Sequence, residues 1–545
     1  MIRLNNISAF VFALLMGALF YIPFLGGIHL FDWDEINFAE SAREMISSGN
    51  FLTVQINYEA FWEKPPLFFW LQVLSVKIFG MGEFAMRFPN ALCGIITLIV
   101  IYRVGERIFD EKFGFIWMMV YAGSLLPFFY FKSGIIDPWF NLFIFLGITH
   151  LAYYFIIQER RLFNISLSGA FLGLAIITKG PVAILILFIV LLVFLFFSKF
   201  RVSIRIKDIL SFSFFLLMIG GSWFLLQILN GNFHIIRDFI EYQIRLFQTE
   251  DAGHGGFLLY HFVILFFGVF PASVFALPAL TKSIVESYHV KSFALWMRIL
   301  FWVVIILFTI VKTRIIHYSS LAYFPITFLG AQMAYRIFQD KQRFREYFRI
   351  LILILSLLFA GITVGISFIG KFMDKLELEK LLNDPFTLAN LQADVKWTGW
   401  ESLTGVLFFI AIIISLYMIK DKRKVIITIF VSSLLFAYSS LLIFTPKIEA
   451  YSQRAAIEFF KSIKDEDAYV ITLGYKSYAH YYYAEIKPKQ NINASNVKWF
   501  LEGDIDKPVY IAFKIHKKDE YLKKYPFLII LYEKNGFVFA KRDVK

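Results

Sequence analysis

Long apolar runs separated by short polar loops fill most of the chain. An apolar run of about twenty residues, folded as a helix, spans the roughly 30 Å hydrocarbon layer of a membrane. We therefore predict a polytopic α-helical membrane protein with about thirteen transmembrane helices. The predicted spans lie near residues 8–28, 84–102, 114–131, 138–157, 166–178, 182–198, 209–229, 258–280, 294–311, 317–335, 350–369, 402–419 and 425–444.

Basic residues occur in alternate loops between these spans. Because cytoplasmic loops carry an excess of Lys and Arg, the basic loops are predicted to face the cytoplasm. They contain Arg103, Arg107 and Lys112, then Arg160 and Arg161, Lys199 to Lys207, Lys282 and Lys291, Arg336 to Arg349, and Lys420 to Lys424. The opposite loops, including the first outer loop at 29–83, then face outward.

The last hundred residues differ in composition from the spans and are richer in Lys, Glu, Asp and Tyr. Helical spacing of apolar residues predicts a helix over 450–463. Strands are predicted over 468–474, 508–514, 527–533 and 536–542. The sequence therefore predicts two domains: a transmembrane domain at 1–445 and a small soluble α/β domain at 446–545 on the outer side.

The composition agrees with a membrane protein, since 59% of the residues are hydrophobic and only 17% are charged. The formal net charge of +13 lies largely in the short loops, so it does not indicate nucleic-acid binding. Residues 8–28 are interpreted as the first span rather than a cleaved signal peptide, because the apolar run is long and no small-residue cleavage pattern follows it. The single cysteine, Cys93, excludes an intrachain disulfide.

The stretch FDWDEINFAESAREM, residues 31–45, places several carboxylates directly after the first span. Helical spacing of the apolar residues from Phe38 onward predicts an amphipathic helix on the membrane surface. Asp32 and Glu35 fit a capping box, which would give them a structural role. Asp34 is left free by that arrangement, and a carboxylate at a membrane interface can act as a general base.

Other polar motifs also fall in the outward loops. Lys64 lies in FWEKPP and Lys179 in TKGP, where both lysines can clamp a lipid phosphate or instead snorkel and occupy a turn. Asp137 precedes Pro138 at the start of a span, which is also a common N-cap arrangement. Arg314 lies in KTRIIHY and can add a further cation. Glu63, His254 and His317 are candidate metal ligands, although their spacing along the chain is not that of a compact metal site.

In order along the chain, DE, EKPP, IDP, TKG, HGG and KTRIIHY resemble the motifs of the membrane glycosyltransferases of the GT-C class. Within that class, the set is most similar to the bacterial aminoarabinose transferases and the protein O-mannosyltransferases, the family 39/83-like group. The aminoarabinose transferases read D-E-x-R in the first motif, whereas Asn37 holds the fourth position here. This departure leaves the sugar and the acceptor open.

The resemblance implies a GT-C fold and transfer of a sugar from a polyprenyl-phosphate donor, such as undecaprenyl phosphate, to an acceptor hydroxyl with inversion. It implies that Asp34 is the base, and we take Glu35 and Asp137 from the same motif set as further candidate catalytic residues. The implied contacts to the donor phosphate are Lys64, Lys179, Tyr318 and Arg314. The resemblance also implies that Glu63 and His254 bind zinc or another divalent metal, and a direct hydrogen bond between these two side chains is the alternative.

The expected partners are the lipid-linked sugar donor, membrane lipids and a lipid or protein acceptor, with lipid A or another envelope glycolipid as the first candidate. No nucleotide or nucleic acid is expected, and the predicted location is the bacterial inner membrane with the site facing the periplasm. The alternatives are an enzyme similar to the protein O-mannosyltransferases, a lipid or solute transporter, and a scaffold protein. A transporter would carry charges near the middle of its spans, whereas the charges here cluster at one end.

Overall fold

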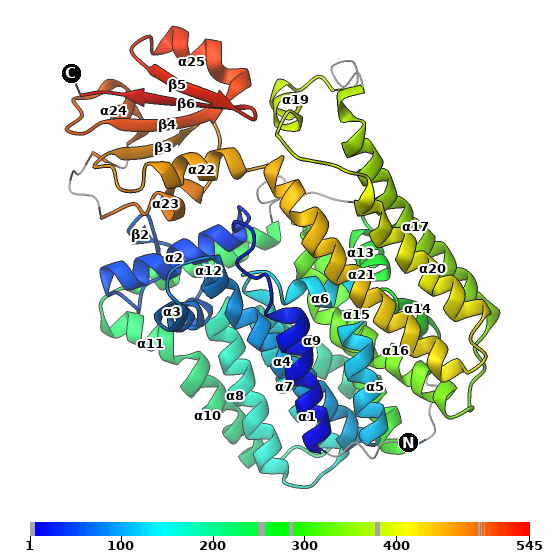
Figure 1. Ribbon diagram of the computed structural model, residues 1–545. Coiled ribbons are helices and arrows are strands. Elements are labelled where there is room, and N and C mark those ends of the chain that lie inside the picture. The colour runs from blue at the N-terminus through cyan, green and yellow to red at the C-terminus, as the bar shows by residue number, and fades with distance from the viewer. Residues whose placement is uncertain are drawn as a thin grey trace.

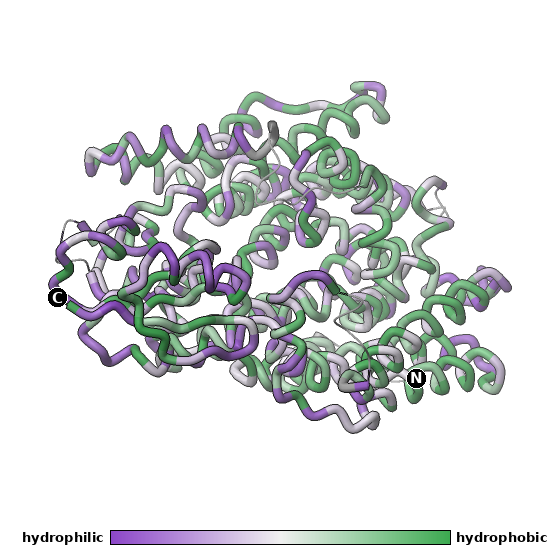
Figure 2. Tube along the Cα trace, turned by 90° about the horizontal axis from the view of Figure 1, so that it is seen from above, coloured by the Kyte–Doolittle hydropathy of each residue, from purple (hydrophilic) through white to green (hydrophobic). Residues whose placement is uncertain are grey.

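The computed structural model describes residues 6–248, 257–282, 287–375, 382–488, 491, 493–494 and 496–544. A bundle of helices carries a small domain with a β-sheet at one end (Figure 1). We call residues 451–544 the tail domain and the adjoining end of the bundle the tail side. Seen along the perpendicular direction, hydrophilic residues concentrate along the tail domain and hydrophobic residues along the helices (Figure 2). The predicted polytopic helical protein with a small α/β domain is confirmed.

Seven helices among the described residues are long and apolar enough to cross a membrane, and two bent helix pairs raise the number to nine. The remaining four predicted spans coincide with shorter helical segments, so thirteen crossings stay a prediction. The seven helices are α4 (Glu83–Ile108), α7 (Asp137–Ile156), α8 (Arg161–Lys179), α15 (Tyr288–Ile310), α17 (Glu346–Lys371), α20 (Leu403–Tyr417, extended to Trp400 by η5) and α21 (Lys422–Ala450). The bent pairs are α10 (Ile206–Gly220) with α11 (Ser222–Leu229), and α13 (Tyr260–Gly268) with α14 and η2 (Ala272–Ala279). The shorter segments are α1 with η1 (Asn6–Tyr21), α5 with α6 (Glu111–Ala122 and Leu125–Tyr130), α9 (Val182–Phe197) and α16 (Tyr323–Phe338).

Side chains at the ends of several helices satisfy the backbone N–H groups that have no partner within the helix. Asp110 accepts a hydrogen bond from the backbone N–H of Phe113 at the start of α5, and Asp421 accepts one from Arg423 at the start of α21. Shorter helices lie on the tail side or in loops: α12 (Phe233–Gln248), η3 (Ile316–Ala322), η4 (Met373–Lys375) and α19 (Pro385–Leu391).

The tail domain is built on a four-stranded sheet with the order β3-β4-β6-β5. Its strands are β3 (Tyr469–Leu473), β4 (Val509–Lys514), β5 (Ile529–Lys534) and β6 (Phe537–Arg542), which lie where the sequence predicts them. The β3–β4 pair is parallel and the other two pairs are antiparallel. The helices of this domain are α22 (Arg454–Ser462), α23 (Ala479–Tyr483), α24 (Val497–Glu502), η6 (Ile515–Lys517) and α25 (Lys518–Lys524). Ala455, Phe459 and Phe460 form the buried face of α22, as the helical spacing predicts.

The first loop after α1 contains α2 (Asp34–Ser48), a hairpin of β1 (Gln55–Ile56) and β2 (Glu59–Ala60), and α3 (Leu67–Phe79). The helix predicted after Asp32 is therefore present, but residues 35–45 are all buried. The structure corrects the expected position on the membrane surface, because α2 lies between the bundle and the tail domain (Figure 1). Arg43 of α2 pairs with Glu40 and donates a hydrogen bond to the backbone carbonyl of Ile486 in the tail domain.

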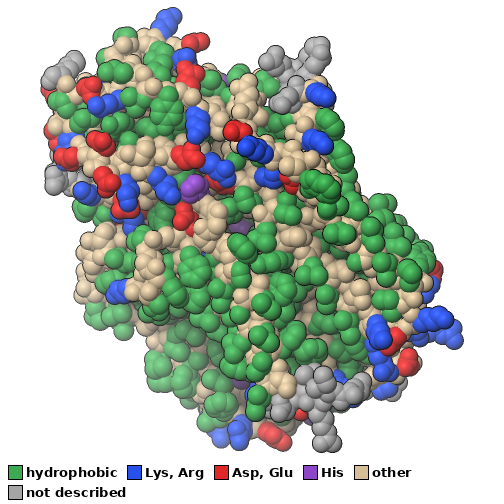
Figure 3. Space-filling view, in the orientation of Figure 1, with side chains coloured by type: hydrophobic (Ala, Val, Ile, Leu, Met, Phe, Trp, Pro, Cys, Tyr) green, Lys and Arg blue, Asp and Glu red, His purple; other side chains and the backbone are tan. Residues whose placement is uncertain are grey.

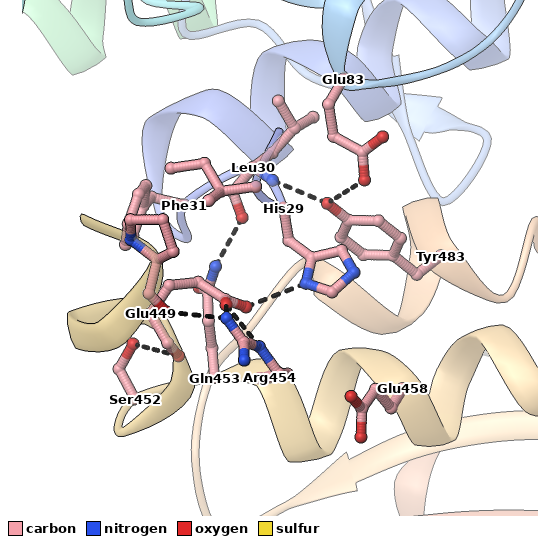
Figure 4. A network of polar contacts seen from close by, with 12 residues as sticks. His29, Leu30, Phe31, Glu83, Glu449, Ser452, Gln453, Arg454, Glu458 and Tyr483 are labelled. Atoms are coloured by element: carbon pink, nitrogen blue, oxygen red, sulfur yellow. Dashed lines mark hydrogen bonds and ion pairs between the residues drawn. The ribbon is translucent and has the colours of Figure 1, made fainter. Parts of the chain in front are cut away.

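A second network joins the same loop to the end of α21 and the start of the tail domain (Figure 4). The buried carboxylate of Glu449 contacts His29 Nδ1 at 2.9 Å and accepts a hydrogen bond from Arg454 Nε at 2.7 Å. The backbone N–H of Leu30 donates to the hydroxyl of Tyr483 at 2.7 Å. The loop is thus held from the side of the tail domain as well as from the bundle.

Hydrophobic side chains cover the visible surface of the helical bundle, and charged side chains gather over the tail domain and along the opposite rim (Figure 3). Many large apolar residues on the spans are exposed, including Phe196, Leu217, Ile310 and Leu357. An exposed apolar surface of this kind is stable in hydrocarbon and would be unfavourable in water. The protein is therefore a multi-pass membrane protein.

A buried ion pair on the tail side joins Glu35 of α2 to Arg87 of α4, with contacts of 2.9 and 2.7 Å. We expect Arg87→Met to lower the free energy of unfolding by about 3–5 kcal/mol, because Glu35 would keep a buried charge without its partner. Arg103→Met is the matched control on the same helix, since the Arg103 side chain is 54% exposed. Thermal unfolding of the detergent-solubilised variants measures the difference, and equal stability of the two variants would contradict this role of the pair.

Candidate active site

Four carboxylates and several cations lie near one another on the tail side, where α2, α7 and η3 begin and α8 ends. The DWDE stretch supplies three of the carboxylates, and each has a different partner. Asp32 accepts hydrogen bonds from the hydroxyl of Ser477 and the backbone N–H of Tyr478, both in the tail domain. Burial raises the pKa of Asp32 to about 6, against its ordinary value of 3.8. Asp32 therefore connects this loop to the tail domain and does not form the predicted capping box.

Glu35 is also held by its neighbours. In addition to Arg87, it accepts hydrogen bonds from the backbone N–H groups of Phe31 at 2.9 Å and Gly134 at 2.5 Å. Burial acts to raise the pKa of Glu35, but the charge and hydrogen bonds of Arg87 outweigh it and lower the pKa. A carboxylate that is 5% exposed and has this many donors is poorly placed to take a proton from a substrate. The geometry favours a structural role for Glu35 in place of the predicted catalytic one.

Asp34 lies between these two anchored residues, and its side chain is 35% exposed. The contact recorded for its carboxylate is with His317 Nε2, 3.5 Å from Oδ2. His317 comes from η3, which is far from Asp34 in sequence. The carboxylate is thus fixed by its neighbours in the chain and still accessible to a second molecule, which is what a general base requires.

Asp137, at the start of α7, lies on the other side of His317. Its Oδ2 is 3.9 Å from His317 Nε2, and its Oδ1 is 2.5 Å from the ammonium group of Lys179 at the end of α8. The side chain of Asp137 is only 5% exposed. Asp34, His317, Asp137 and Lys179 therefore form a continuous row, in which His317 lies between two carboxylates and Asp137 positions Lys179.

Lys64 completes the cluster of cations. Its ammonium group is 3.8 Å from Glu63 and 5.1 Å from the centre of the Tyr242 ring, and its side chain is 15% exposed. Burial lowers the pKa of Lys64; the charge of Glu63 acts in the opposite direction, and that of Lys179 adds to the lowering. The charge of Lys179 therefore acts at Lys64, which places Lys64 within electrostatic range of Lys179.

Tyr318 and Arg314 lie on the same segment as His317. The Lys179 ammonium group is 5.2 Å from the centre of the Tyr318 ring, which places Tyr318 beside the cations as predicted. Arg314 precedes η3 and is partly buried, and its Nε makes no hydrogen bond within the described part of the chain. The structure thus brings Asp34, Asp137, Lys179 and Tyr318 together through His317, with Lys64 within electrostatic range.

Sequence reasoning treated His317 only as a candidate metal ligand, and it missed Tyr242 and Arg87. An arginine inside an apolar span is a signal that a buried acidic partner exists, because an unpaired charge there is costly. That signal predicts a partner for Arg87 without identifying Glu35. Nothing in the sequence near Tyr242 points to Lys64.

The predicted metal ligands can be examined only in part, because His254 lies outside the described residues. Glu63 is described, and its nearest charged group is the Lys64 ammonium at 3.8 Å. Within the described ranges, no group of three or more His, Cys, Asp and Glu side chains is arranged to hold a metal ion. Of the two predicted ligands, the structure describes only Glu63, so zinc binding stays a prediction.

Comparisons with known proteins agree with the motif set. Residues 63–223 match the family described as dolichyl-phosphate-mannose-protein mannosyltransferase. The undecaprenyl phosphate-alpha-4-amino-4-deoxy-L-arabinose arabinosyl transferase of Photorhabdus laumondii is 27% identical over 49% of this chain and 49% of its own length. The chain therefore spans about half the length of that relative.

Two solved structures have the same fold over nearly the whole chain. ArnT from Cupriavidus metallidurans, bound to undecaprenyl phosphate, superposes with a TM-score of 0.76 and 18% identity over 97% of both chains. The oligosaccharyltransferase of Archaeoglobus fulgidus gives a TM-score of 0.51 and 12% identity over 95% of this chain and 70% of its own. The predicted GT-C fold and the resemblance to aminoarabinose transferases are confirmed.

If Glu63 and His254 share a zinc ion, purified protein should contain about one zinc per chain, and Glu63→Gln should lose it, because a zinc site needs several close protein ligands. Elemental analysis by mass spectrometry gives the metal content directly. Glu241→Gln is the control, since the Glu241 side chain is 70% exposed. Protein that is free of zinc before any chelator treatment would contradict the metal site and favour a hydrogen bond between the two side chains.

Proposed function

We propose that this chain is a membrane glycosyltransferase that moves a sugar from an undecaprenyl-phosphate donor to an acceptor hydroxyl on the tail side of the membrane. The observation that carries the proposal is the accessible carboxylate of Asp34 beside a cluster of cations. The fold and the sequence relatives support the same class of reaction. The proposed location is the bacterial inner membrane with the tail side in the periplasm, which agrees with the basic loops at the opposite ends of the spans.

Asp34 is the best base among the carboxylates of the site. Asp32 is bound by Ser477, and Asp137 is bound by Lys179, so both are engaged in contacts that organise the protein. Asp34 is more exposed than Asp137, and its only ion pair among the described residues is the longer contact with His317. An acceptor hydroxyl that reaches Asp34 can transfer its proton there as its oxygen attacks the anomeric carbon.

The displacement is balanced by departure of the lipid phosphate. The new bond forms between the acceptor oxygen and the anomeric carbon, the bond from that carbon to the phosphate oxygen breaks, and the electron pair leaves with undecaprenyl phosphate. A single displacement with one base inverts the configuration of the anomeric carbon. Lys64 and Lys179 stabilise the negative charge that grows on the phosphate, and no general acid is needed because phosphate is already a good leaving group.

The acceptor is proposed to be lipid A or another glycolipid of the envelope. Mass spectrometry of outer lipids and lipid-linked sugars, from cells with and without the protein, tests this proposal. The expected result is one hexose- or pentose-sized mass added to a glycolipid and a donor lipid that accumulates when the protein is missing. Addition of the sugar to a protein would instead assign an activity similar to the protein O-mannosyltransferases.

Asp34→Asn should abolish sugar transfer, with a loss of at least about a hundredfold, because the amide cannot accept the proton. Donor binding should remain within about twofold of the native protein, since the cations are unchanged. Asp394→Asn, at an exposed aspartate of another loop, is the control. Product formation from a radiolabelled donor measures the loss, and full activity of Asp34→Asn would rule out this base.

Lys64→Ala and Lys179→Ala should each weaken donor binding by about 1–3 kcal/mol, the range of a charge-assisted hydrogen bond. Lys396→Ala, at an exposed lysine, is the control.

Because burial lowers the pKa of Lys64, it loses its proton at a lower pH than an ordinary lysine. Donor affinity of the native protein should therefore decrease as the pH rises toward the usual range of lysine, and Lys64→Ala should lose much of this dependence. Titration with undecaprenyl phosphate at several pH values measures both effects, and unchanged affinity in both alanine variants would reject the phosphate contacts.

A further inference from the structure

Two polar segments meet at the end of the bundle that points away from the tail domain. Residues 336–349 lie where α16 ends and α17 begins, and residues 418–424 lie where α20 ends and α21 begins. Arg423 joins the segments, because its Nε donates a hydrogen bond to the backbone carbonyl of Phe338 at 3.0 Å and its guanidinium group lies 3.6 Å from the carboxylate of Asp340. We call the two segments together the basic rim. Lys and Arg side chains gather at this end of α20 and α21 (Figure 3).

Cations outnumber carboxylates in the basic rim by nine to three. Each of the three carboxylates already has a partner. Asp340 pairs with Arg423, and Glu346 pairs with Arg349 at 3.0 Å. Asp421 accepts a hydrogen bond from the backbone N–H of Arg423 at the start of α21. Five exposed cations form no ion pair within the described part of the chain: Lys341, Arg343, Arg345, Lys420 and Lys424. The basic rim therefore carries positive charge that the protein itself does not neutralise.

Two long helices, α17 and α21, begin in the basic rim. The first N–H groups of a helix have no partner within it and carry a partial positive charge, which favours anions. Asp421 caps α21, whereas Arg345 is the N-cap residue of α17 and makes no side-chain hydrogen bond there. The start of α17 therefore has no side-chain acceptor, and an anion with several oxygen atoms would supply one.

An apolar stripe on α17 starts directly beside the basic rim. Ile350, Ile354 and Leu357 are each more than half exposed. Their spacing of four and three residues places them on one face of the helix. Such a stripe is stable against hydrocarbon chains and unfavourable in water. The basic rim and the stripe together fit a molecule that has both an anionic group and an apolar chain.

The length of the adjoining helices sets the depth of the basic rim in the membrane. Trp400, which is 73% exposed, lies at the tail-side end of α20, and exposed Trp residues are typical of the membrane interface. Lys420 follows after about twenty residues, which as a helix span about 30 Å, the thickness of the hydrocarbon layer. The basic rim is thus at the level of the lipid phosphates of the leaflet opposite to the tail domain, which favours a lipid partner over a protein that approaches from the water.

We propose that the basic rim binds anionic phospholipids of this leaflet. The lipid phosphate lies at the start of α17, beside Arg343 and Arg345, and an acyl chain follows the stripe on α17. The stripe alone accepts any phospholipid, and the unpaired cations select one with a net negative charge. This inference depends on the membrane spans and not on the proposed transfer reaction, so it can fail while the proposed function stands.

Native mass spectrometry of the detergent-solubilised full chain tests the binding. The probes are phosphatidylglycerol, with one net negative charge, and phosphatidylethanolamine, with none, carrying identical acyl chains. Phosphatidylglycerol should bind at least about fivefold more tightly, and added salt should reduce this preference because it screens exposed charges. Equal affinity for the two lipids would overturn the inference.

A combined variant locates the binding. Arg343→Gln with Arg345→Gln and Lys424→Gln should raise the Kd for phosphatidylglycerol about fivefold and leave the Kd for phosphatidylethanolamine within twofold of its native value, which shows that the apolar surface is intact. Arg343→Lys with Arg345→Lys should retain the native preference, since the charge remains.

The matched control is Arg103→Gln with Lys112→Gln. These residues belong to segment 103–112 at the same end of the bundle, where three cations are balanced by three carboxylates. The control should leave the Kd for phosphatidylglycerol within twofold of its native value, and an increase equal to that of the combined variant would contradict a site at the basic rim. An unchanged Kd in the combined variant, together with loss of a co-purified acidic protein, would overturn the inference and assign the basic rim to a protein partner.

Discussion

The buried ion pair between Glu35 and Arg87 determines where the first outer loop lies. Arg87 not only pairs with Glu35 but also donates hydrogen bonds to the backbone carbonyls of Leu25, Ile28 and His29. One guanidinium group therefore fixes the exit of the first helix and the start of α2 at the same point. Both charges are buried, where polar interactions are strong and an unpaired group is costly, so this arrangement tolerates little displacement.

This constraint explains how one short stretch can carry several carboxylates with different roles. Glu35 is bound to the bundle and Asp32 to the tail domain, so the residue between them, Asp34, is held from both sides while its own carboxylate stays accessible. The network of His29, Glu449 and Arg454 strengthens the connection to the tail domain (Figure 4). The position of the proposed base therefore depends on the tail domain as much as on the membrane spans, so the tail domain is part of the proposed catalytic unit.

Local pattern predicted the local elements well, because periodicity reports which residues face the core. Nine of the predicted spans, counting the two bent pairs, and the tail strands coincide with helices and strands of the described residues, and the motif order predicted the fold. Contacts between distant segments could not be predicted, since no local signal links Arg87 to Glu35 or His317 to Asp34. The position of α2 was predicted wrongly for the same reason: an amphipathic pattern shows that one face is covered, and it does not distinguish lipid from a protein domain. The spacing of Asp32 and Glu35 predicts a cap, whereas their main partners, Ser477 and Arg87, come from other parts of the chain.

The pairing of Lys179 with Asp137 bears on how the lipid-linked sugar would enter. Lys179 is held by Asp137 before any phosphate is bound, which avoids the cost of a bare ammonium group at the edge of the membrane. A phosphate that attracts Lys179 weakens this pair, and the nearest imidazole to Asp137 is then that of His317, whose Nε2 is 3.9 Å away and would have to move closer to form a hydrogen bond. The same Nε2 lies 3.5 Å from Asp34, and one N–H group cannot serve both carboxylates fully. Binding of the lipid-linked sugar would thus draw His317 toward Asp137 and away from Asp34. The carboxylate of Asp34 would then be free to accept a proton when the leaving group is in place.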